Sequence, residues 1–349
     1  MMRPVITPQK SDIPENMNTM GRIAVIGSGS WATALAKLLL ANCERIIWFV
    51  RRAERIEDFI RLRHNPTYLS DVSLDTDRID FTSDINYACR EADTILFVTP
   101  SPYFKETADS VTVDISEKNI VSAVKGIVPG HNVIVTDYLV ERFGCHPDRL
   151  LVIGGPCHAE EVALERLSYL TIGCRDLRKS HHFAALLAGK SMKTIASPDV
   201  DGIEYAAVLK NVYAIMAGII NGMKIGDNFM AMMVCNATRE MARFIDAIAP
   251  MPGRDVCRSA YLGDLLVTAY SRFSRNHNFG SMIGKGYSVK VATMEMAMVA
   301  EGYYGTKTIH EINANGPKVD MPILECVYSI LYRGVSPRKA IEGITPSFT

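Results

Sequence analysis

The chain contains a glycine-rich stretch that is typical of a dinucleotide-binding loop. Residues 27–32, GSGSWA, follow the apolar run 23–26 and lead into a segment without Gly or Pro that is expected to be helical. Gly27 permits a sharp turn, Gly29 lets the backbone approach a ligand closely, and Ala32 keeps the helix close to the strand. The helix N-terminus would direct N–H groups and a partial positive charge at a pyrophosphate. A simple tight turn between a strand and a helix is the alternative.

In dinucleotide-binding domains, the residue at the end of the second strand distinguishes NAD from NADP. An acidic residue at that point binds the ribose 2′-hydroxyl of NAD, whereas an arginine accommodates the 2′-phosphate of NADP. After the apolar run 45–50 this chain has Arg51 and Arg52 and no acidic residue. The sequence therefore permits NADP and does not exclude NAD. Two solvated charges at the end of a strand are the alternative.

Two lysines lie where an acid or base would be useful. Lys210 is part of a long segment, 201–223, whose apolar spacing predicts a helix, and it lies beside a face of small residues. A lysine desolvated there, especially near another cation, would have a pKa below the usual value of about 10.4 and closer to the useful range of roughly 7–8. Lys125 follows an apolar run and precedes Gly126, so it would lie at the carboxyl end of a strand, which faces the ligand crevice in doubly wound folds. The alternatives are a lysine that extends to solvent from a helix edge and a solvated strand end.

The elements that must position these residues change in character along the chain. Up to about residue 197, apolar runs alternate with helical patterns, which predicts an α/β fold with a parallel, doubly wound sheet. The predicted strands are 23–26, 45–50, 94–100, 119–125, 150–154, 168–174 and 192–196. Beyond residue 199 only helical patterns follow, at 201–223, 228–247, 259–271, 288–300, 305–313 and 322–332. We therefore predict a flexible tail over 1–20, a dinucleotide-binding domain over 21–197 and an all-helical domain over 198–349.

Composition narrows the classes of partner. The 349 residues include 38 basic and 38 acidic side chains, so no net charge favours nucleic acid or a membrane surface. None of the eight cysteines has CxxC spacing, which argues against a metal site and favours reduced thiols in the cytoplasm. The N-terminal residues do not resemble a signal peptide, and the longest apolar stretches are interrupted or too short for a membrane span.

Further stretches occur in a characteristic order after the glycine-rich loop. They are VSAVKGIVP (121–129), GGPCHAEEVA (154–163), YAAVLKNVYAIMAGIINGMKIGDN (205–228), YLGDLLVTAYSRFSRNHNFGSMIGKG (261–286) and EGYYGTKTI (301–309). Together with the loop they resemble the NAD(P)-dependent glycerol-3-phosphate dehydrogenases of the bacterial type, from about Arg22 to beyond residue 330. The resemblance implies an N-terminal Rossmann domain and an all-helical C-terminal domain. It also implies reversible reduction of dihydroxyacetone phosphate to sn-glycerol 3-phosphate, a precursor of glycerophospholipids.

The resemblance assigns roles to the chemically active residues. It makes Lys210 the general acid and base, places Asp264 beside it, and lets Lys125 contact the substrate and polarise its carbonyl. The stretch Ser274-Arg275-Asn276 would hold the phosphate, because arginine can bind two phosphate oxygens at once. The predicted substrate contacts are Lys125, Gly155, Cys157, Asn211, Asp264, Thr268, Ser274, Arg275 and Asn276. The predicted cofactor contacts are Gly27, Gly29, Ser30, Trp31, Arg51, Arg52, Lys125, Ala159, Arg275 and Glu301.

Several alternatives to these roles stay open at this point. Asp264 could simply cap a helix, and residues 274–276 could form a solvated loop. The family usually has serine where this chain has Cys157 and an aromatic residue where it has His158, and a thiol is a weaker donor than a hydroxyl. A related dehydrogenase acting on another hydroxy acid or sugar phosphate, and a non-catalytic NAD(P)-binding sensor, are the competing functions. A homodimer is the hypothesis for the oligomeric state.

Overall fold

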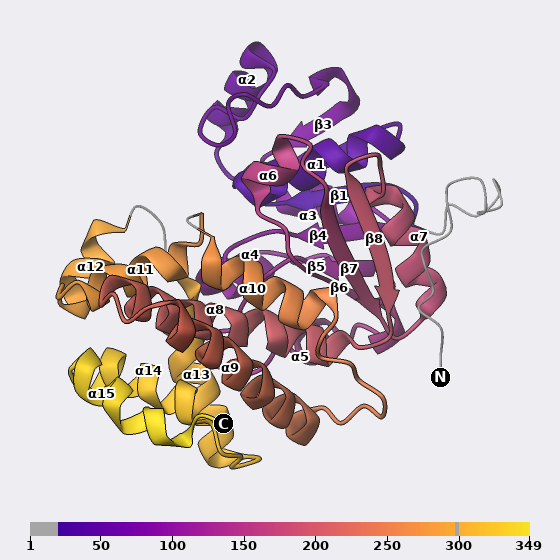
Figure 1. Cartoon of the computed structure of the whole chain (residues 1–349). Helices are drawn as coiled ribbons and strands as arrows, with labels where there is room; N and C mark the ends of the chain where they lie inside the picture. The colour runs from indigo at the N-terminus through magenta and orange to yellow at the C-terminus, as the bar shows by residue number, and fades with distance from the viewer. Residues whose placement is uncertain (1–19, 272, 297–299) are drawn as a thin grey trace. The chain divides into compact units, whose positions relative to one another are not determined.

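The computed structural model describes residues 20–271, 273–296 and 300–349 (Figure 1). The chain forms two compact units. One unit contains residues 20–124 and 135–200, and the other contains residues 125–134 and 201–349. The single boundary predicted at residue 197 does not describe this division, because segment 125–134, with Lys125, belongs to the helical unit. Of the predicted tail only Met20 is among the described residues, and it is buried.

The first unit is built on an eight-stranded sheet with the order β3-β2-β1-β4-β5-β6-β7-β8. Most of its strands are apolar runs that are buried on both faces, as parallel strands covered by helices must be. The strands are β1 (Ile23–Ile26), β2 (Ile46–Phe49), β3 (Ile79–Thr82), β4 (Thr94–Phe97), β5 (Asn119–Ser122), β6 (Leu150–Gly154), β7 (Ser168–Cys174) and β8 (Met192–Ser197). The predicted α/β fold with a doubly wound sheet is confirmed, although β3 was not predicted.

One strand pair departs from the predicted parallel sheet, so that β7 and β8 run opposite to the other six strands. β7 pairs with β6 in the antiparallel direction, whereas every other strand pair in the sheet is parallel. The connection between them contains only the five-residue helix α6 (Ala159–Ala163). A parallel crossover needs a longer connection, usually a full helix, to return the chain to the opposite edge of the sheet. The chain therefore re-enters the sheet at the edge where β6 ended.

Helices α1 to α7 alternate with the strands. They are α1 (Ser30–Asn42), α2 (Ala53–Leu62), α3 (Ile85–Glu91), α4 (Ser101–Asp109), α5 (Val135–Phe143), α6 and α7 (Leu177–Leu187). Asp84 and Asp176 cap α3 and α7, because each carboxylate accepts a hydrogen bond from a backbone N–H of the first turn. Next to α2 the core contains an aromatic cluster in which the rings of Trp48 and Phe59 lie 5.1 Å apart.

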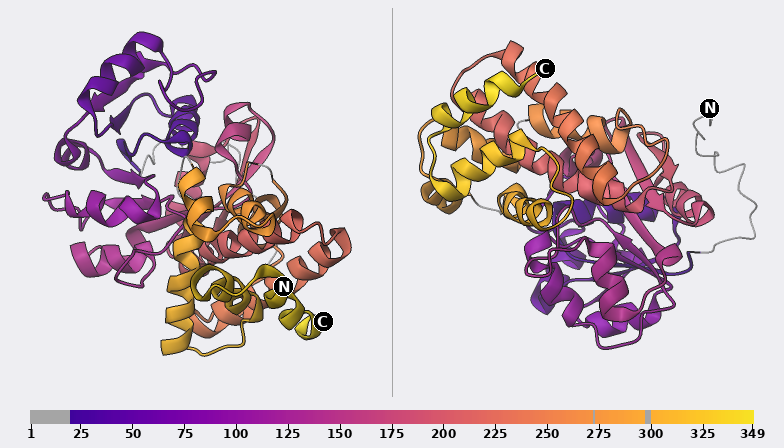
Figure 2. Two further views of the ribbon diagram at one scale, coloured as in Figure 1. Left: turned by 90° about the vertical axis from the view of Figure 1, so that its left-hand side faces the viewer. Right: turned by 90° about the horizontal axis from the view of Figure 1, so that it is seen from below.

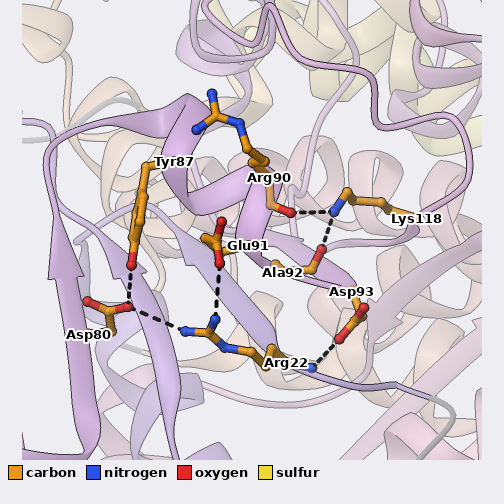
Figure 3. Close-up of polar contacts among 8 residues, drawn as sticks. All are labelled: Arg22, Asp80, Tyr87, Arg90, Glu91, Ala92, Asp93 and Lys118. Atoms are coloured by element: carbon orange, nitrogen blue, oxygen red, sulfur yellow. Dashed lines mark hydrogen bonds and ion pairs between the residues drawn. The ribbon is translucent and has the colours of Figure 1, made fainter.

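Charged side chains close the edge of the sheet at which the parallel strands begin (Figure 3). The backbone N–H of Arg22 donates to Asp93, and its guanidinium reaches Glu91 and Asp80. Lys118 donates to two backbone carbonyls at the end of α3, those of Arg90 and Ala92. These contacts fix the starts of β1, β4 and β5, and the opposite edge is left for the glycine-rich loop. The residues of this cluster are Arg22, Asp80, Tyr87, Arg90, Glu91, Ala92, Asp93 and Lys118.

The second unit is helical, and in Figure 2 the orange and yellow ribbon shows helices and turns without a strand in the described part. Its helices are α8 (Val200–Gly222), α9 (Asp227–Ile248), α10 (Asp264–Tyr270), α11 (Arg275–Gly284), α12 (Val289–Glu295), α13 (Glu301–Asn315), α14 (Pro322–Arg333) and α15 (Pro337–Ile344). The predicted helical domain is confirmed. The predicted helix 259–271 divides into a π-helical turn, Ser259–Gly263, and α10, and part of the predicted helix 288–300 lies outside the described residues.

Helix α8 is the core of this unit. It is long and apolar enough to cross a membrane, but the whole apolar window is buried inside the protein. A helix that is apolar on all sides is typical of the centre of a large globular domain. Because α8 also carries Lys210 and Asn211, the site residues it supplies are held by packing on every side.

Glycines bring α8 and α11 into backbone contact. A Cβ at Gly218 would lie 2.0 Å from the carbonyl oxygen of His277, and a Cβ at Gly280 would lie 2.0 Å from that of Ile215. Gly222 and Gly284, one turn further along each helix, make the same kind of contact at 2.3 Å. Glycines four residues apart lie on one face of a helix, so the two faces interlock without side chains. This crossing fixes the distance between Lys210 on α8 and Arg275 on α11.

Candidate active site

A buried ion pair lies at the centre of the helical unit. The ammonium nitrogen of Lys210 is 2.5 Å from Oδ1 of Asp264, and their side chains are only 4% and 2% exposed. Oδ2 of Asp264 has no hydrogen-bond partner among the described residues. Asp264 begins α10 directly after the π-helical turn, and the helix has no side-chain cap. The alternative in which Asp264 only caps a helix is therefore wrong, since its carboxylate faces Lys210.

The environment of Lys210 makes it a competent proton donor and acceptor. Burial lowers the pKa of Lys210, Asp264 raises it, and the nearby charge of Lys125 lowers it, and the net result is a pKa of about 8. A lysine with this pKa is present in both charged and neutral forms near neutral pH and can give or take a proton, whereas an exposed lysine stays almost fully charged. The structure thus contradicts the alternative of a lysine that extends to solvent. Lys125 is the nearby second cation that was expected to lower the pKa of Lys210.

Neighbouring side chains lock this arrangement. The amide nitrogen of Asn211 donates to the backbone carbonyl of Lys125 at 3.2 Å. This hydrogen bond connects segment 125–134 to α8. The hydroxyl of Thr268 donates to the backbone carbonyl of Asp264 at 2.6 Å and lies 3.4 Å from its Oδ1. Five of the predicted residues, Lys125, Lys210, Asn211, Asp264 and Thr268, are therefore brought together within one unit.

The predicted phosphate-binding stretch forms the start of a helix. Ser274 caps α11, because its hydroxyl oxygen accepts from the N–H of His277, and Arg275 is the first helical residue. Oδ1 of Asn276 accepts from the N–H of Gly302 at 2.9 Å, next to Glu301 at the start of α13. Ser274 and Asn276 are buried. The alternative of a solvated loop is wrong, and the N-terminus of α11 adds a partial positive charge beside Arg275.

The glycine-rich loop lies in the other unit, between β1 and α1. Gly27 has φ +130°, and a Cβ there would lie 2.6 Å from the carbonyl oxygen of Val98, so only glycine fits. No heavy atom lies within 4 Å of the position that a Cβ would take at Gly29. Helix α1, which begins with Ser30 and Trp31, has no side-chain cap and no acidic residue in its first turn. An open, uncapped helix N-terminus behind glycines fits a pyrophosphate.

Arg51 and Arg52 occupy the position expected for cofactor selection. They follow β2, which pairs with β1 so that Phe49 lies opposite Ile26, just before the loop. Both side chains are exposed, and neither guanidinium has a hydrogen bond or ion pair with the described part of the chain. Because these guanidinium groups form no contacts that stabilise the fold in the described part of the chain, they are available to bind the 2′-phosphate of NADP.

The remaining predicted residues follow β6 in the sheet unit. Gly155 has φ +109°, and a Cβ there would lie 2.9 Å from the carbonyl oxygen of Tyr169. The thiol of Cys157 is buried and donates to that same carbonyl at 3.0 Å. Ala159 begins α6. The thiol at position 157 is thus already used within the protein, in keeping with its departure from the family pattern.

Comparison with known families bears directly on this arrangement. The family model for the N-terminus of NAD-dependent glycerol-3-phosphate dehydrogenase matches residues 22–180, and the model for the C-terminus of the same family matches residues 199–342. The chain belongs to this family. The resemblance noted from the sequence is confirmed, and the N-terminal and C-terminal parts of the family match this chain in the same order.

Individual relatives agree over nearly the whole length. Glycerol-3-phosphate dehydrogenase [NAD(P)+] of Lysinibacillus sphaericus is 33% identical over 93% of this chain and 96% of the relative. The enzyme of the same name from Bacillus subtilis is 31% identical over 93% of this chain and 94% of the relative. The crystal structure of glycerol-3-phosphate dehydrogenase from Coxiella burnetii superposes with a TM-score of 0.84 at 25% identity, covering 93% and 98% of the two chains.

We expect Asp264→Asn to move the pH profile of this glycerol-3-phosphate dehydrogenase to lower pH. The carboxylate raises the pKa of Lys210, so its removal leaves burial and Lys125 to lower that pKa below about 8. Reduction needs the charged lysine and should fail at a lower pH than in the unaltered protein, whereas oxidation should begin at a lower pH. Rates of both directions measured from pH 6 to 10 test this, and an unchanged midpoint would contradict it.

Proposed function

We propose that this protein reversibly reduces dihydroxyacetone phosphate to sn-glycerol 3-phosphate with NADH or NADPH and so supplies the backbone of glycerophospholipids. The observation that carries the proposal is the buried Lys210–Asp264 pair in a chain of this family, where one carboxylate oxygen has no partner in the described part of the chain. The substrate class is a phosphorylated triose. Nicotinamide cofactor, when bound, supplies or accepts the hydride, and the residues of this chain provide the binding, orientation and proton transfer.

The proton step falls to Lys210. In reduction its charged Nζ gives a proton to the oxygen of the former carbonyl, and in oxidation its neutral form takes the hydroxyl proton. Asp264 stabilises the charged form through Oδ1. Its Oδ2, to which none of the described residues donates, is suited to accept a hydrogen bond from a hydroxyl of the substrate. The Lys125 ammonium adds positive charge that favours negative charge developing on that oxygen. Thr268 and Asn211 hold Asp264 and Lys125 in register.

The phosphate of the substrate is proposed to bind at the start of α11. Arg275 can hold two phosphate oxygens, while Ser274 and Asn276 add neutral donors beside the helix N-terminus. For the cofactor, the loop 27–32 and the N-terminus of α1 would hold the pyrophosphate. Gly155 and Cys157 remain proposed substrate contacts, and Ala159, Lys125, Arg275 and Glu301 remain proposed cofactor contacts.

The decisive assay follows the loss of NADH or NADPH absorbance with dihydroxyacetone phosphate as substrate. Turnover with this triose, and much lower turnover with other hydroxy-acid or sugar-phosphate precursors, supports the proposal. A folded protein that binds the cofactor without turnover would instead be the sensor considered above. Activity confined to a different carbonyl substrate would identify a related dehydrogenase.

We expect the double variant Arg51→Ser, Arg52→Ser to raise the KM for NADPH by roughly tenfold or more and to leave that for NADH within about twofold. A charge-assisted hydrogen bond to the 2′-phosphate is worth about 1.5–3 kcal/mol, and NADH lacks that group. Arg61→Ser, an exposed arginine on α2, is the matched control. Equal losses for both cofactors would contradict a role in selecting the 2′-phosphate.

We infer that the enzyme works in the cytoplasm, because all eight cysteines lie in the described residues and none of them is joined to another by a disulfide bond there. The homodimer remains a hypothesis. A measurement of molar mass by light scattering at several protein concentrations tests it directly, and a mass of one chain throughout would reject it.

A further inference from the structure

Three consecutive carbonyls of the glycine-rich loop are each held by a side chain. The indole N–H of the buried Trp48 donates to the carbonyl of Gly27 at 2.7 Å. The amide of Asn65 donates to the carbonyl of Ser28 at 3.1 Å, and the hydroxyl of Thr33 donates to that of Gly29 at 3.0 Å. The loop is thus fastened at every peptide from residue 27 to residue 29.

Asn65 connects most of this network. Its side chain is 1% exposed, and all of its hydrogen-bonding groups are used. The amide nitrogen donates to the carbonyl of Ser28 and, at 2.7 Å, to the hydroxyl of Thr33. The amide oxygen accepts from the backbone N–H groups of Thr67 and Tyr68 at 3.0 and 3.1 Å. One residue therefore joins the turn after α2 to the glycine-rich loop.

This fastening has a direct consequence for the N–H groups of the loop. A trans peptide is planar, so each N–H points opposite to the carbonyl of the same peptide. Donors that hold the carbonyls of residues 27–29 therefore direct the N–H groups of Ser28, Gly29 and Ser30 the other way. Those N–H groups are the ones that a helix N-terminal loop offers to a pyrophosphate. The carbonyl of Gly29 also accepts the backbone N–H of Thr33 at 3.0 Å, so the peptides that depend most on side-chain donors are those after Gly27 and Ser28. Without these donors, those two peptides could rotate.

We propose that Asn65 is a positioning residue for the dinucleotide: it holds the loop in its binding conformation without touching the ligand. The inference rests on the proposed function, in that the loop must bind NAD(P)H. The hydrogen bond from Asn65 to Thr33 fixes the orientation of the Thr33 hydroxyl, whose own proton goes to the carbonyl of Gly29. Asn65 thereby acts on two successive peptides of the loop at once.

The test compares Asn65→Ala with Asn86→Ala. Asn86 is a matched control in the same unit, because its side chain likewise joins a helix start to a loop, through the N–H groups of Thr112 and Val113 and the carbonyl of Ser110. None of these partners belongs to the glycine-rich loop. The chain has only two tryptophans, Trp31 and Trp48, and both lie at this loop, so their fluorescence reports binding without turnover.

Titration with NADPH and with NADH should give a dissociation constant roughly tenfold higher for Asn65→Ala and nearly unchanged for Asn86→Ala. In turnover, the KM for the cofactor should rise much more than kcat falls. Thr33→Val removes the shared hydroxyl, and its loss should not add fully to that of Asn65→Ala in the double variant, because both act through Gly29. Thermal unfolding of each variant without ligand separates folding from binding.

The outcomes are distinct. If the unaltered protein binds neither cofactor, the proposed function fails, and with it the premise of this inference. If the unaltered protein binds and Asn65→Ala binds equally well but melts at a lower temperature, Asn65 is only structural and the inference is overturned. Weaker binding by Asn65→Ala at a temperature where it is fully folded, with Asn86→Ala unaffected, supports the inference.

Discussion

Replacement of Lys210 by methionine is expected to lower kcat for the reduction of dihydroxyacetone phosphate by roughly 10²–10⁴-fold. Methionine has a similar length but cannot give or take a proton. Lys210→Arg should be almost as inactive, because arginine keeps its charge at every accessible pH and does not release a proton. The measurement is kcat at saturating substrate and cofactor, beside a titration showing that the cofactor still binds.

A loss of activity after this substitution must be separated from a loss of folding. Lys210→Met leaves the carboxylate of Asp264 buried without its cation, and breaking a buried pair in this way costs about 3–5 kcal/mol of unfolding free energy. The double variant Lys210→Met, Asp264→Asn removes the unpaired charge and should recover much of that stability. Its activity should remain low. Recovered activity in the double variant would contradict the role of Lys210 as acid and base.

Substitution of Gly280 by alanine is expected to damage both stability and activity, although the residue is apolar and buried. The added Cβ would lie 2.0 Å from the carbonyl oxygen of Ile215, so α11 must move away from α8. Overpacking of a core costs about 1–3 kcal/mol, and more where the obstacle is backbone. The movement carries Arg275 away from Lys210, and a displacement of about 1 Å in an active site can cost about 100-fold in rate.

The control for this prediction is another helical glycine. Gly343 lies in α15, and no heavy atom lies within 4 Å of its would-be Cβ. Gly343→Ala should therefore stabilise the protein slightly, since alanine favours a helix over glycine by about 1 kcal/mol. Thermal unfolding and kcat/KM are measured for both variants. Equal effects of the two substitutions would show that the contact between α8 and α11 is not rigid.

The parts of the fold that local patterns determine were predictable. Buried β-branched runs such as β1 and β4 gave the strands, and the disappearance of such runs after residue 197 gave the helical unit. β3 was missed because four residues with an aspartate carry too little pattern. The direction of β7 was missed because it depends on the length of the helix in its connection, which no single strand records.

The parts of the candidate site that depend on neighbouring residues in the sequence could also be predicted, whereas contacts between distant residues could not. The glycine-rich loop could be predicted from its own residues, since a strand, glycines and a helix follow one another. The pairing of Lys210 with Asp264 joins residues far apart in the sequence, and only the family resemblance suggested it. Asn65 gave no signal, because a polar residue before a proline in a turn is ordinary until its buried contacts are known.

Segment 125–134 belongs to the helical unit although it lies within the sequence of the sheet unit, and this affects how the protein can be divided into fragments. A cut between residues 200 and 201 would follow the visible change from strands to helices, yet it would leave Lys125 on the wrong fragment. The helical fragment would then lack the backbone carbonyl to which Asn211 donates, as well as the second ammonium group near Lys210. A chimera that exchanges the helical unit between relatives must therefore transfer segment 125–134 together with residues 201–349. The residues of the proposed catalytic set come from two separate stretches of the chain, and both must come from the same parent.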